Sequence, residues 1–157
     1  MSGRSERGED MRTAKRVVNQ VSMTLPAKSV NESYARVAAA ALATQADPTM
    51  EQMADIKTAV SEAVTNAIVH AYRGHGDGKV YITMKLLEGG EFSITVRDTG
   101  CGIDNVKQAR EPCFTTAPGE ERSGMGFSIM EAFMDKLRVR SVPGRGTTVT
   151  MVKQLAR

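Results

Sequence analysis

Residues 79–98 read KVYITMKLLEGGEFSITVRD, two runs of alternating apolar and polar residues on either side of Glu88-Gly89-Gly90. An alternation with a period of two is typical of a strand with one buried face. A short glycine-containing break between two such runs indicates a β-hairpin. We therefore predict antiparallel strands at residues 79–87 and 91–98.

The chain on both sides of this hairpin predicts further strands and three helices. The first helix is expected to begin with a capping box at residues 29–32, and the second carries apolar residues at helical spacing. The resulting order predicts an α+β fold in two layers, with helices packed on one face of a mixed, mostly antiparallel sheet. The other expected strands cover residues 17–25, 137–141 and 147–153, and the expected helices cover about 29–45, 50–72 and 124–136.

Length and composition are those of one globular domain. The chain has 157 residues, of which 41% are hydrophobic and 25% are charged, and this is enough to bury a single core. Residues 1–15 are polar, charged and aperiodic, so we expect a disordered basic leader followed by one domain over residues 16–157.

Several classes of protein are disfavoured by the composition. The chain has no Trp and only 4% aromatic residues, which argues against a platform for stacking nucleic-acid bases. No apolar run approaches the roughly 20 residues that span a membrane, and the N-terminus lacks the apolar core of a secretory signal. Cys101 and Cys113 match no disulfide or zinc pattern. We expect a cytoplasmic protein that binds neither membranes nor nucleic acid directly.

A carboxylate and a carboxamide share one face of the predicted second helix. Glu62 and Asn66 are four residues apart, and residues at this spacing are neighbours on a helix surface. They lie next to the apolar stripe, where polar groups are costly to bury without partners. The pair is either a solvated face or a general base beside a Mg²⁺ ligand, since Mg²⁺ prefers oxygen ligands.

Two glycine-containing motifs follow. Asp98-Thr99-Gly100-Cys101-Gly102 ends a strand, where it is either an ordinary turn or a carboxylate that accepts a hydrogen bond from an amine such as that of adenine. Residues 122–127, RSGMGF, open the third helix, where they are either a capped loop or a site for an anion at the helix N-terminus. The long segment between these motifs, residues 99–123, is expected to be a functional lid.

The order of the three motifs resembles the GHKL, or Bergerat, superfamily of ATP-binding proteins. Within that superfamily the chain resembles the anti-sigma F factor family from about Val17 to its C-terminus. The stretches that carry this closer resemblance are NESYARV at 31–37, DPTM at 47–50, FTT at 114–116, ERSGMGF at 121–127, IMEAFMD at 129–135 and GTTV at 146–149.

The resemblance implies a GHKL-type fold and an ATP-dependent protein serine kinase that also acts as an anti-sigma factor. Such a protein binds and inhibits a sporulation sigma factor and uses ATP and Mg²⁺ to phosphorylate a serine of an anti-anti-sigma protein. It acts as a homodimer, with ATP and ADP setting which partner it holds. Three alternatives remain open: an anti-sigma B type stress-response kinase, the catalytic domain of a sensor histidine kinase, and a nucleotide-switched binding module without kinase activity.

The resemblance also implies roles for individual residues. Glu62 is the catalytic base, Asn66 the Mg²⁺ ligand, Asp98 the adenine contact, and Arg36 a contact with a protein partner. The other residues implied at the nucleotide are Gly100, Gly102, Thr115, Thr116, Arg122, Ser123, Gly124, Met125, Gly126 and Thr148, with Thr147 as the alternative to Thr148.

Overall fold

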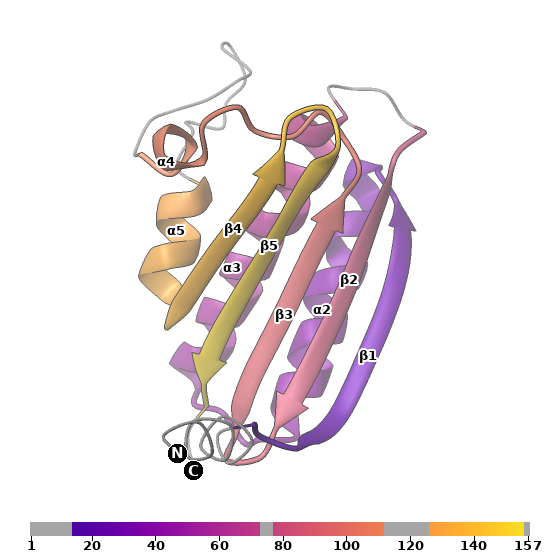
Figure 1. Ribbon diagram of the computed structural model, residues 1–157. Helices are drawn as coiled ribbons and strands as arrows, with labels where there is room; N and C mark the ends of the chain where they lie inside the picture. Colours follow the sequence, from indigo (N-terminus) through magenta and orange to yellow (C-terminus); the bar gives the residue numbers. More distant parts are fainter. Residues whose placement is uncertain (1–13, 73–76, 112–125, 156–157) are drawn as a thin grey trace, which may run out of the picture.

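A computed structural model describes residues 14–72, 77–111 and 126–155, which form a sheet covered by helices on one face (Figure 1). The sheet has five strands in the order β1-β2-β3-β5-β4, and every neighbouring pair is antiparallel. The predicted two-layer α+β class is thus confirmed, with an antiparallel sheet in place of a mixed one. The strands are β1 (Val17–Pro26), β2 (Lys79–Leu87), β3 (Glu91–Asp98), β4 (Lys136–Val142) and β5 (Gly146–Gln154).

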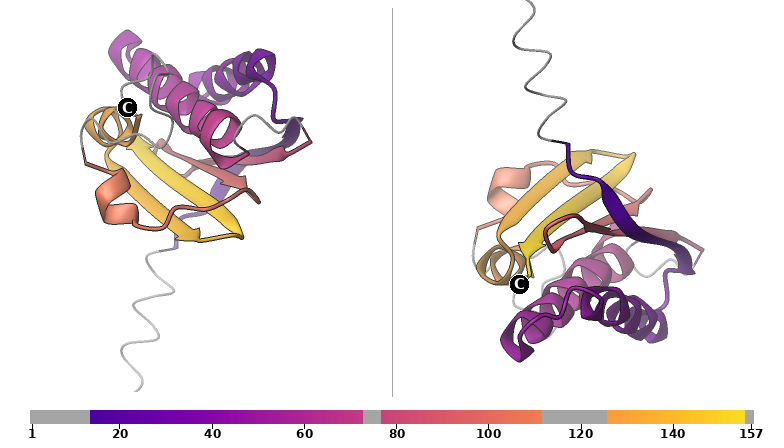
Figure 2. Two further views of the ribbon diagram at one scale, coloured as in Figure 1. Left: turned by 90° about the horizontal axis from the view of Figure 1, so that it is seen from above. Right: turned by 90° about the horizontal axis from the view of Figure 1, so that it is seen from below.

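The helices α2, α3 and α5 lie on the same side of the sheet, as the two views along its length show (Figure 2). The predicted hairpin at residues 79–98 is confirmed, and the alternate residues of its strands are buried under these helices. The helical elements are η1 (Ser29–Asn31), α2 (Glu32–Thr44), α3 (Met50–Asn66), the π-helix η2 (Ala67–Ala71), α4 (Val106–Ala109) and α5 (Gly126–Phe133).

The core lies between α3 and the central strands. On α3, Ile56, Val60 and Val64 are fully buried, and they recur at the four-residue spacing of one helix face. They pack against the inner sides of β2 and β3, where Ile82, Ile94 and five other apolar residues are at most 4% exposed. This burial fixes α3 along the sheet, and α3 carries both Glu62 and Asn66.

The predicted capping box at residues 29–32 is wrong. Residues Ser29–Asn31 form a short 3-10 helix, and α2 begins at Glu32 without a side-chain cap. The Glu32 carboxylate does not fold back on its own helix terminus because it has better donors, the Ser61 hydroxyl and the Arg36 guanidinium. The hydrogen bond from Ser61 ties α2 to α3, whereas Arg36 lies on α2 itself.

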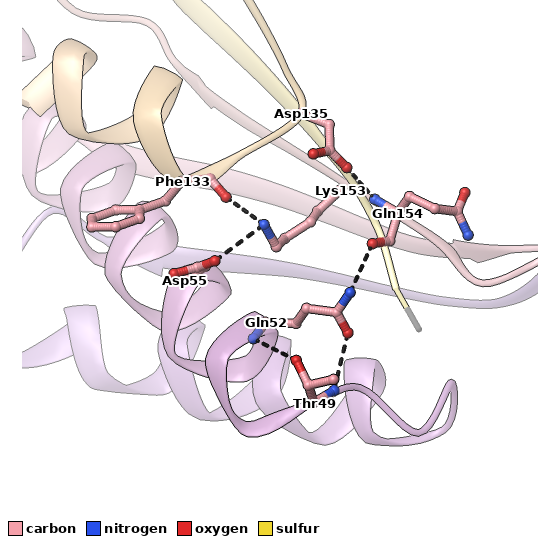
Figure 3. A network of polar contacts seen from close by, with 7 residues as sticks. All are labelled: Thr49, Gln52, Asp55, Phe133, Asp135, Lys153 and Gln154. Atoms are coloured by element: carbon pink, nitrogen blue, oxygen red, sulfur yellow. Dashed lines mark hydrogen bonds and ion pairs between the residues drawn. The ribbon is translucent and has the colours of Figure 1, made fainter. Parts of the chain in front are cut away.

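A capping box does occur at the start of α3, at the Asp47-Pro48-Thr49 break. The Thr49 hydroxyl accepts a hydrogen bond from the Gln52 backbone at 3.1 Å, and the Gln52 side chain accepts one from the Thr49 backbone at 3.0 Å (Figure 3). At its other end α3 is shorter than predicted, because the α-helix stops at Asn66 and continues as the π-helix η2.

Some predictions fall outside the described residues. These are most of the leader, since residues 1–13 are not described, and residues 112–123 of the predicted lid. In the three described ranges no helix combines the length and the apolar character needed to cross a membrane.

The capping box of α3 predicts a specific loss of stability. Thr49→Ala removes the hydroxyl acceptor, so the free energy of unfolding should fall by about 1 kcal/mol in urea denaturation. Thr58→Ala is the matched control, because Thr58 is exposed within the same helix and Ala is a good helix former. The control should be as stable as the wild type or slightly more so. An unchanged midpoint for Thr49→Ala would contradict a stabilising cap.

Candidate active site

The first two predicted motifs and the described part of the third, Gly126 and Phe127, meet at one end of the sheet, the upper end in Figure 1. There α3 ends at Asn66, β3 ends at Asp98 and α5 begins at Gly126. A Cβ atom built on Gly126 would lie 3.0 Å from Nδ2 and 3.1 Å from Oδ1 of Asn66. The backbone at the start of α5 therefore contacts the Asn66 carboxamide, and any side chain at position 126 would crowd it.

Glu62 lies one turn before Asn66 on α3, about 6 Å along the helix axis. Both side chains are half-buried. Within the part of the chain that the structure describes, neither side chain makes a hydrogen bond or an ion pair. The carboxylate and the carboxamide at this end of α3 thus have no polar partner among the described residues.

Asp98 is a buried carboxylate, 6% exposed. Its Oδ1 accepts hydrogen bonds from the backbone N–H of Gly100 at 3.0 Å and of Thr147 at 3.2 Å. Burial raises the pKa of Asp98, and the two backbone hydrogen bonds and the nearby Arg97 oppose that rise. Among the described residues both bonds go to Oδ1, so Oδ2 remains an acceptor for a ligand.

Glycines let the chain after Asp98 pass between two other segments. A Cβ atom on Gly100 would lie 2.2 Å from the carbonyl oxygen of Ala71, which also accepts a hydrogen bond from Cys101 N–H at 2.8 Å. Gly102 has a φ of +73°, and a Cβ atom there would lie 2.4 Å from the carbonyl oxygen of Val142. Only residues without a side chain fit between η2 and the β4–β5 turn.

The structure places Thr147, rather than Thr148, beside Asp98. Thr147 is buried on the helix-facing side of β5 and donates its backbone N–H to Asp98. Thr148 is paired with Arg97, and successive side chains of a strand point to opposite faces. Arg97 is exposed and lies over the Tyr81 ring at 4.2 Å from its centroid. Of the two threonines, Thr147 is the one we now expect to contribute to the site.

A further residue of this network is Ser141. Its hydroxyl lies 2.9 Å from the Thr147 hydroxyl and accepts a hydrogen bond from the Ile103 backbone at 2.7 Å. It therefore joins β4 to the segment after Asp98. Sequence reasoning missed Ser141, because a serine in an alternating strand carries no signal of its own.

The side-chain oxygens at this end of the sheet fit Mg²⁺ only if a bound ligand supplies further oxygen atoms. The described residues contain no group of three or more His, Cys, Asp or Glu side chains that could hold a metal by themselves. Mg²⁺ is commonly held by one or two protein oxygens, with waters and phosphate oxygens completing its shell. Asn66, with Glu62 one turn away, fits that kind of site.

The remaining predicted residues are either on another helix or outside the described part of the chain. Arg36 is on α2, where its guanidinium pairs with Glu32 at 3.3 Å, and Glu32 accepts a hydrogen bond from Ser61, the neighbour of Glu62. Arg36 is thus connected to α3 despite its distance in sequence. Six predicted nucleotide residues lie outside the described residues: Thr115, Thr116, Arg122, Ser123, Gly124 and Met125.

Known proteins are similar to this chain over most of its length. Residues 9–153 match the histidine kinase-like ATPase domain. The anti-sigma F factor of Priestia megaterium is 53% identical over 137 residues, covering 87% of this chain and 93% of that protein. The anti-sigma F factor of Halalkalibacterium halodurans is 52% identical over 139 residues, covering 88% and 94%.

Solved structures show the same fold. The RsbU and RsbW domains of a Mycobacterium tuberculosis protein superpose with a TM-score of 0.65 at 22% identity, covering 89% of this chain and 33% of that chain. The blue-light activated histidine kinase of Erythrobacter litoralis EL346 superposes with a TM-score of 0.51 at 27% identity, covering 69% and 32%.

The raised pKa of Asp98 predicts how stability depends on pH. Because the folded state holds this proton more tightly than the unfolded state, ionising Asp98 lowers stability as the pH rises above its ordinary pKa of 3.8. Asp98→Asn keeps an oxygen that accepts from Gly100 and Thr147 but cannot ionise. Its free energy of unfolding relative to wild type should therefore increase from about pH 4 to about pH 7 in urea titrations. A pH-independent difference would contradict the buried carboxylate.

Proposed function

Because the chain belongs to the anti-sigma F factor family of histidine kinase-like ATPases, we propose that it is an ATP-dependent protein serine kinase that also binds and inhibits a sporulation sigma factor. The contact between Gly126 and Asn66 carries this proposal. Helix N-termini bind phosphate groups. The contact brings the N-terminus of α5 to the face of α3 that carries the Glu62 carboxylate and the Asn66 carboxamide.

The nucleotide binds between the end of β3 and the start of α5. Asp98 accepts the amino group of adenine on Oδ2, while its Oδ1 stays bonded to the backbone. The phosphates lie at the N-terminus of α5, where the N–H groups of the first turn and the helix dipole favour an anion. Asn66 would hold Mg²⁺ together with phosphate oxygens, and the bound ion would supply positive charge that neutralises the phosphates.

Glu62 is the base of the transfer. Its carboxylate takes the proton from the serine hydroxyl of the protein substrate as the hydroxyl oxygen bonds to the γ-phosphorus. The bond from that phosphorus to the bridging oxygen of ATP breaks, which leaves phosphoserine and ADP. The half-buried position of Glu62, with no partner among the described residues, suits a group that meets a substrate rather than one that holds the fold together.

The protein partners bind over the first part of the helical layer. Val30, Tyr34 and Val37 lie in one short segment and are 76%, 63% and 65% exposed, respectively. Exposed apolar residues gathered in this way are typical of a protein interaction site. Arg36 lies in the same segment with its side chain 43% exposed. We assign this surface to the sigma factor and to the anti-anti-sigma substrate.

The chain acts in the cytoplasm as a homodimer, and ATP or ADP at the nucleotide site sets which partner it holds. Relatives that are 52–53% identical and are anti-sigma F factors favour this role over that of a sensor histidine kinase. An acid-stable phosphorylated product would be phosphoserine, whereas an acid-labile one would be phosphohistidine. A chain that binds nucleotide and partners without any transfer would be a nucleotide-switched binding module.

Glu62→Gln keeps the shape of the side chain and removes the base. Incubation with labelled ATP and a candidate anti-anti-sigma protein should show phosphorylation slower by about 10²–10⁴-fold, with ATP affinity nearly unchanged. Glu51→Gln is the matched control, because Glu51 is an exposed glutamate in the first turn of the same helix. It should transfer phosphate at the wild-type rate. Wild-type transfer by Glu62→Gln would exclude Glu62 as the base.

Arg36→Ala removes a guanidinium that can bond a partner carboxylate. Binding to the sigma factor or the anti-anti-sigma substrate should weaken by about 1.5–3 kcal/mol in surface plasmon resonance. ATP affinity should stay constant in calorimetry, because the nucleotide site is built from other elements. Arg138→Ala, on the exposed side of β4, is the control for charge. If Arg36→Ala and wild type bind the partners with equal affinity, Arg36 is not part of the partner-binding surface.

A further inference from the structure

Lys153 is a buried cation at the end of the sheet opposite the candidate site. It is 8% exposed and lies on the helix-facing side of β5. Its Nζ donates to the carbonyl oxygen of Phe133 at 2.6 Å and pairs with the Asp55 carboxylate at 3.2 Å (Figure 3). An ammonium group out of water requires such partners, so these two contacts hold its position.

These contacts join three elements that build the candidate site. Phe133 is the last residue of α5, and Asp55 belongs to α3. A cation at the carbonyl end of a helix bonds an otherwise unpaired carbonyl and is favoured by the helix dipole. The chain just after α5 is also attached to β5, because Asp135 donates its N–H to Val152 at 2.8 Å and accepts from Gln154 at 2.6 Å.

The other end of α5 is Gly126, which contacts Asn66 on α3. The eight residues of α5 form a stiff rod of about 12 Å. Fixing Phe133 against α3 and β5 therefore also sets where Gly126 stands relative to Asn66. The two helices are joined at one end by Lys153 and meet at the proposed phosphate site at the other.

We propose that Lys153 is a positioning residue for phosphate binding, which acts by holding α5 through the Phe133 carbonyl. The inference rests on the proposed nucleotide site. A purely stabilising role explains the arrangement less well, because a buried ion pair contributes little net stability compared with apolar side chains of similar size. A cation is needed here to bond the last carbonyl of α5 and the Asp55 carboxylate together.

The test separates phosphate binding from adenine binding by calorimetry with ATP and with adenosine. Lys153→Met should weaken ATP binding by about tenfold, equivalent to ~1.4 kcal/mol, because the N-terminus of α5 shifts. Adenosine affinity should not change, since Asp98 lies on β3. Lys153→Arg, which keeps a cation, and Asp55→Asn, which keeps the bond to Phe133, should bind ATP within about twofold of wild type.

A double variant covers the case in which Lys153→Met does not fold. Asp55→Asn with Lys153→Met leaves no unpaired buried charge and should show the same selective loss of ATP affinity. Wild-type ATP affinity in a folded Lys153→Met or double variant would overturn the proposal. An equal loss of adenosine affinity would also overturn it, because the substitution would then disturb the whole nucleotide site and not only its phosphate end.

Amide hydrogen exchange without nucleotide distinguishes failure of this inference from failure of the proposed function. The α5 amides should exchange faster in Lys153→Met than in wild type, while those of α2 should not change. Unchanged exchange in α5 would overturn the positioning role, even if the chain binds ATP. Faster exchange confined to α5 would show that Lys153 anchors this helix, and a wild type that binds no ATP would then contradict the proposed nucleotide site rather than the anchoring.

Discussion

The burial of α3 against the inner face of the sheet is the constraint on which the rest of the structure depends. Ile56, Val60 and Val64 are fully buried, and burying one such side chain contributes roughly 1.5–3 kcal/mol. Because their stripe runs along the helix, α3 cannot rotate or slide without exposing apolar surface. Every polar group on α3 therefore has a defined position relative to the strands.

The two ends of α3 serve different purposes. At its start the capping box of Thr49 and Gln52 and the ion pair of Asp55 satisfy polar groups within the chain. At its end Glu62 and Asn66 have no partner among the described residues. The π-helix begins directly after Asn66, and such local departures from α-helical geometry are frequent at functional sites. The groups that stabilise the fold and those of the proposed ligand site thus lie at opposite ends of one helix.

Close backbone contacts give the proposed site its shape. Gly100 and Gly126 each occupy a place where a Cβ atom would meet another residue at 3.0 Å or less. The segments after β3 and at the start of α5 can therefore come close to α3 and η2. In the same region, backbone N–H groups from two segments hold the Asp98 carboxylate. The orientation of this carboxylate is therefore fixed before any ligand binds.

Hydrophobic periodicity in the sequence was sufficient to predict the strands, the α3 stripe and the two-layer class, because local spacing determines which faces can be buried. The spacing of Glu62, Asn66, Asp98 and Gly126 was sufficient to predict a candidate site. Tertiary contacts decided which side chains become partners, which residue spacing in the sequence cannot encode. Thr147 rather than Thr148 faces Asp98, because a shift of one residue in strand register reverses every side chain. Glu32 bonds Ser61 and Arg36 instead of capping its helix, and Lys153 finds Phe133 and Asp55, because these partners come together only when distant segments pack.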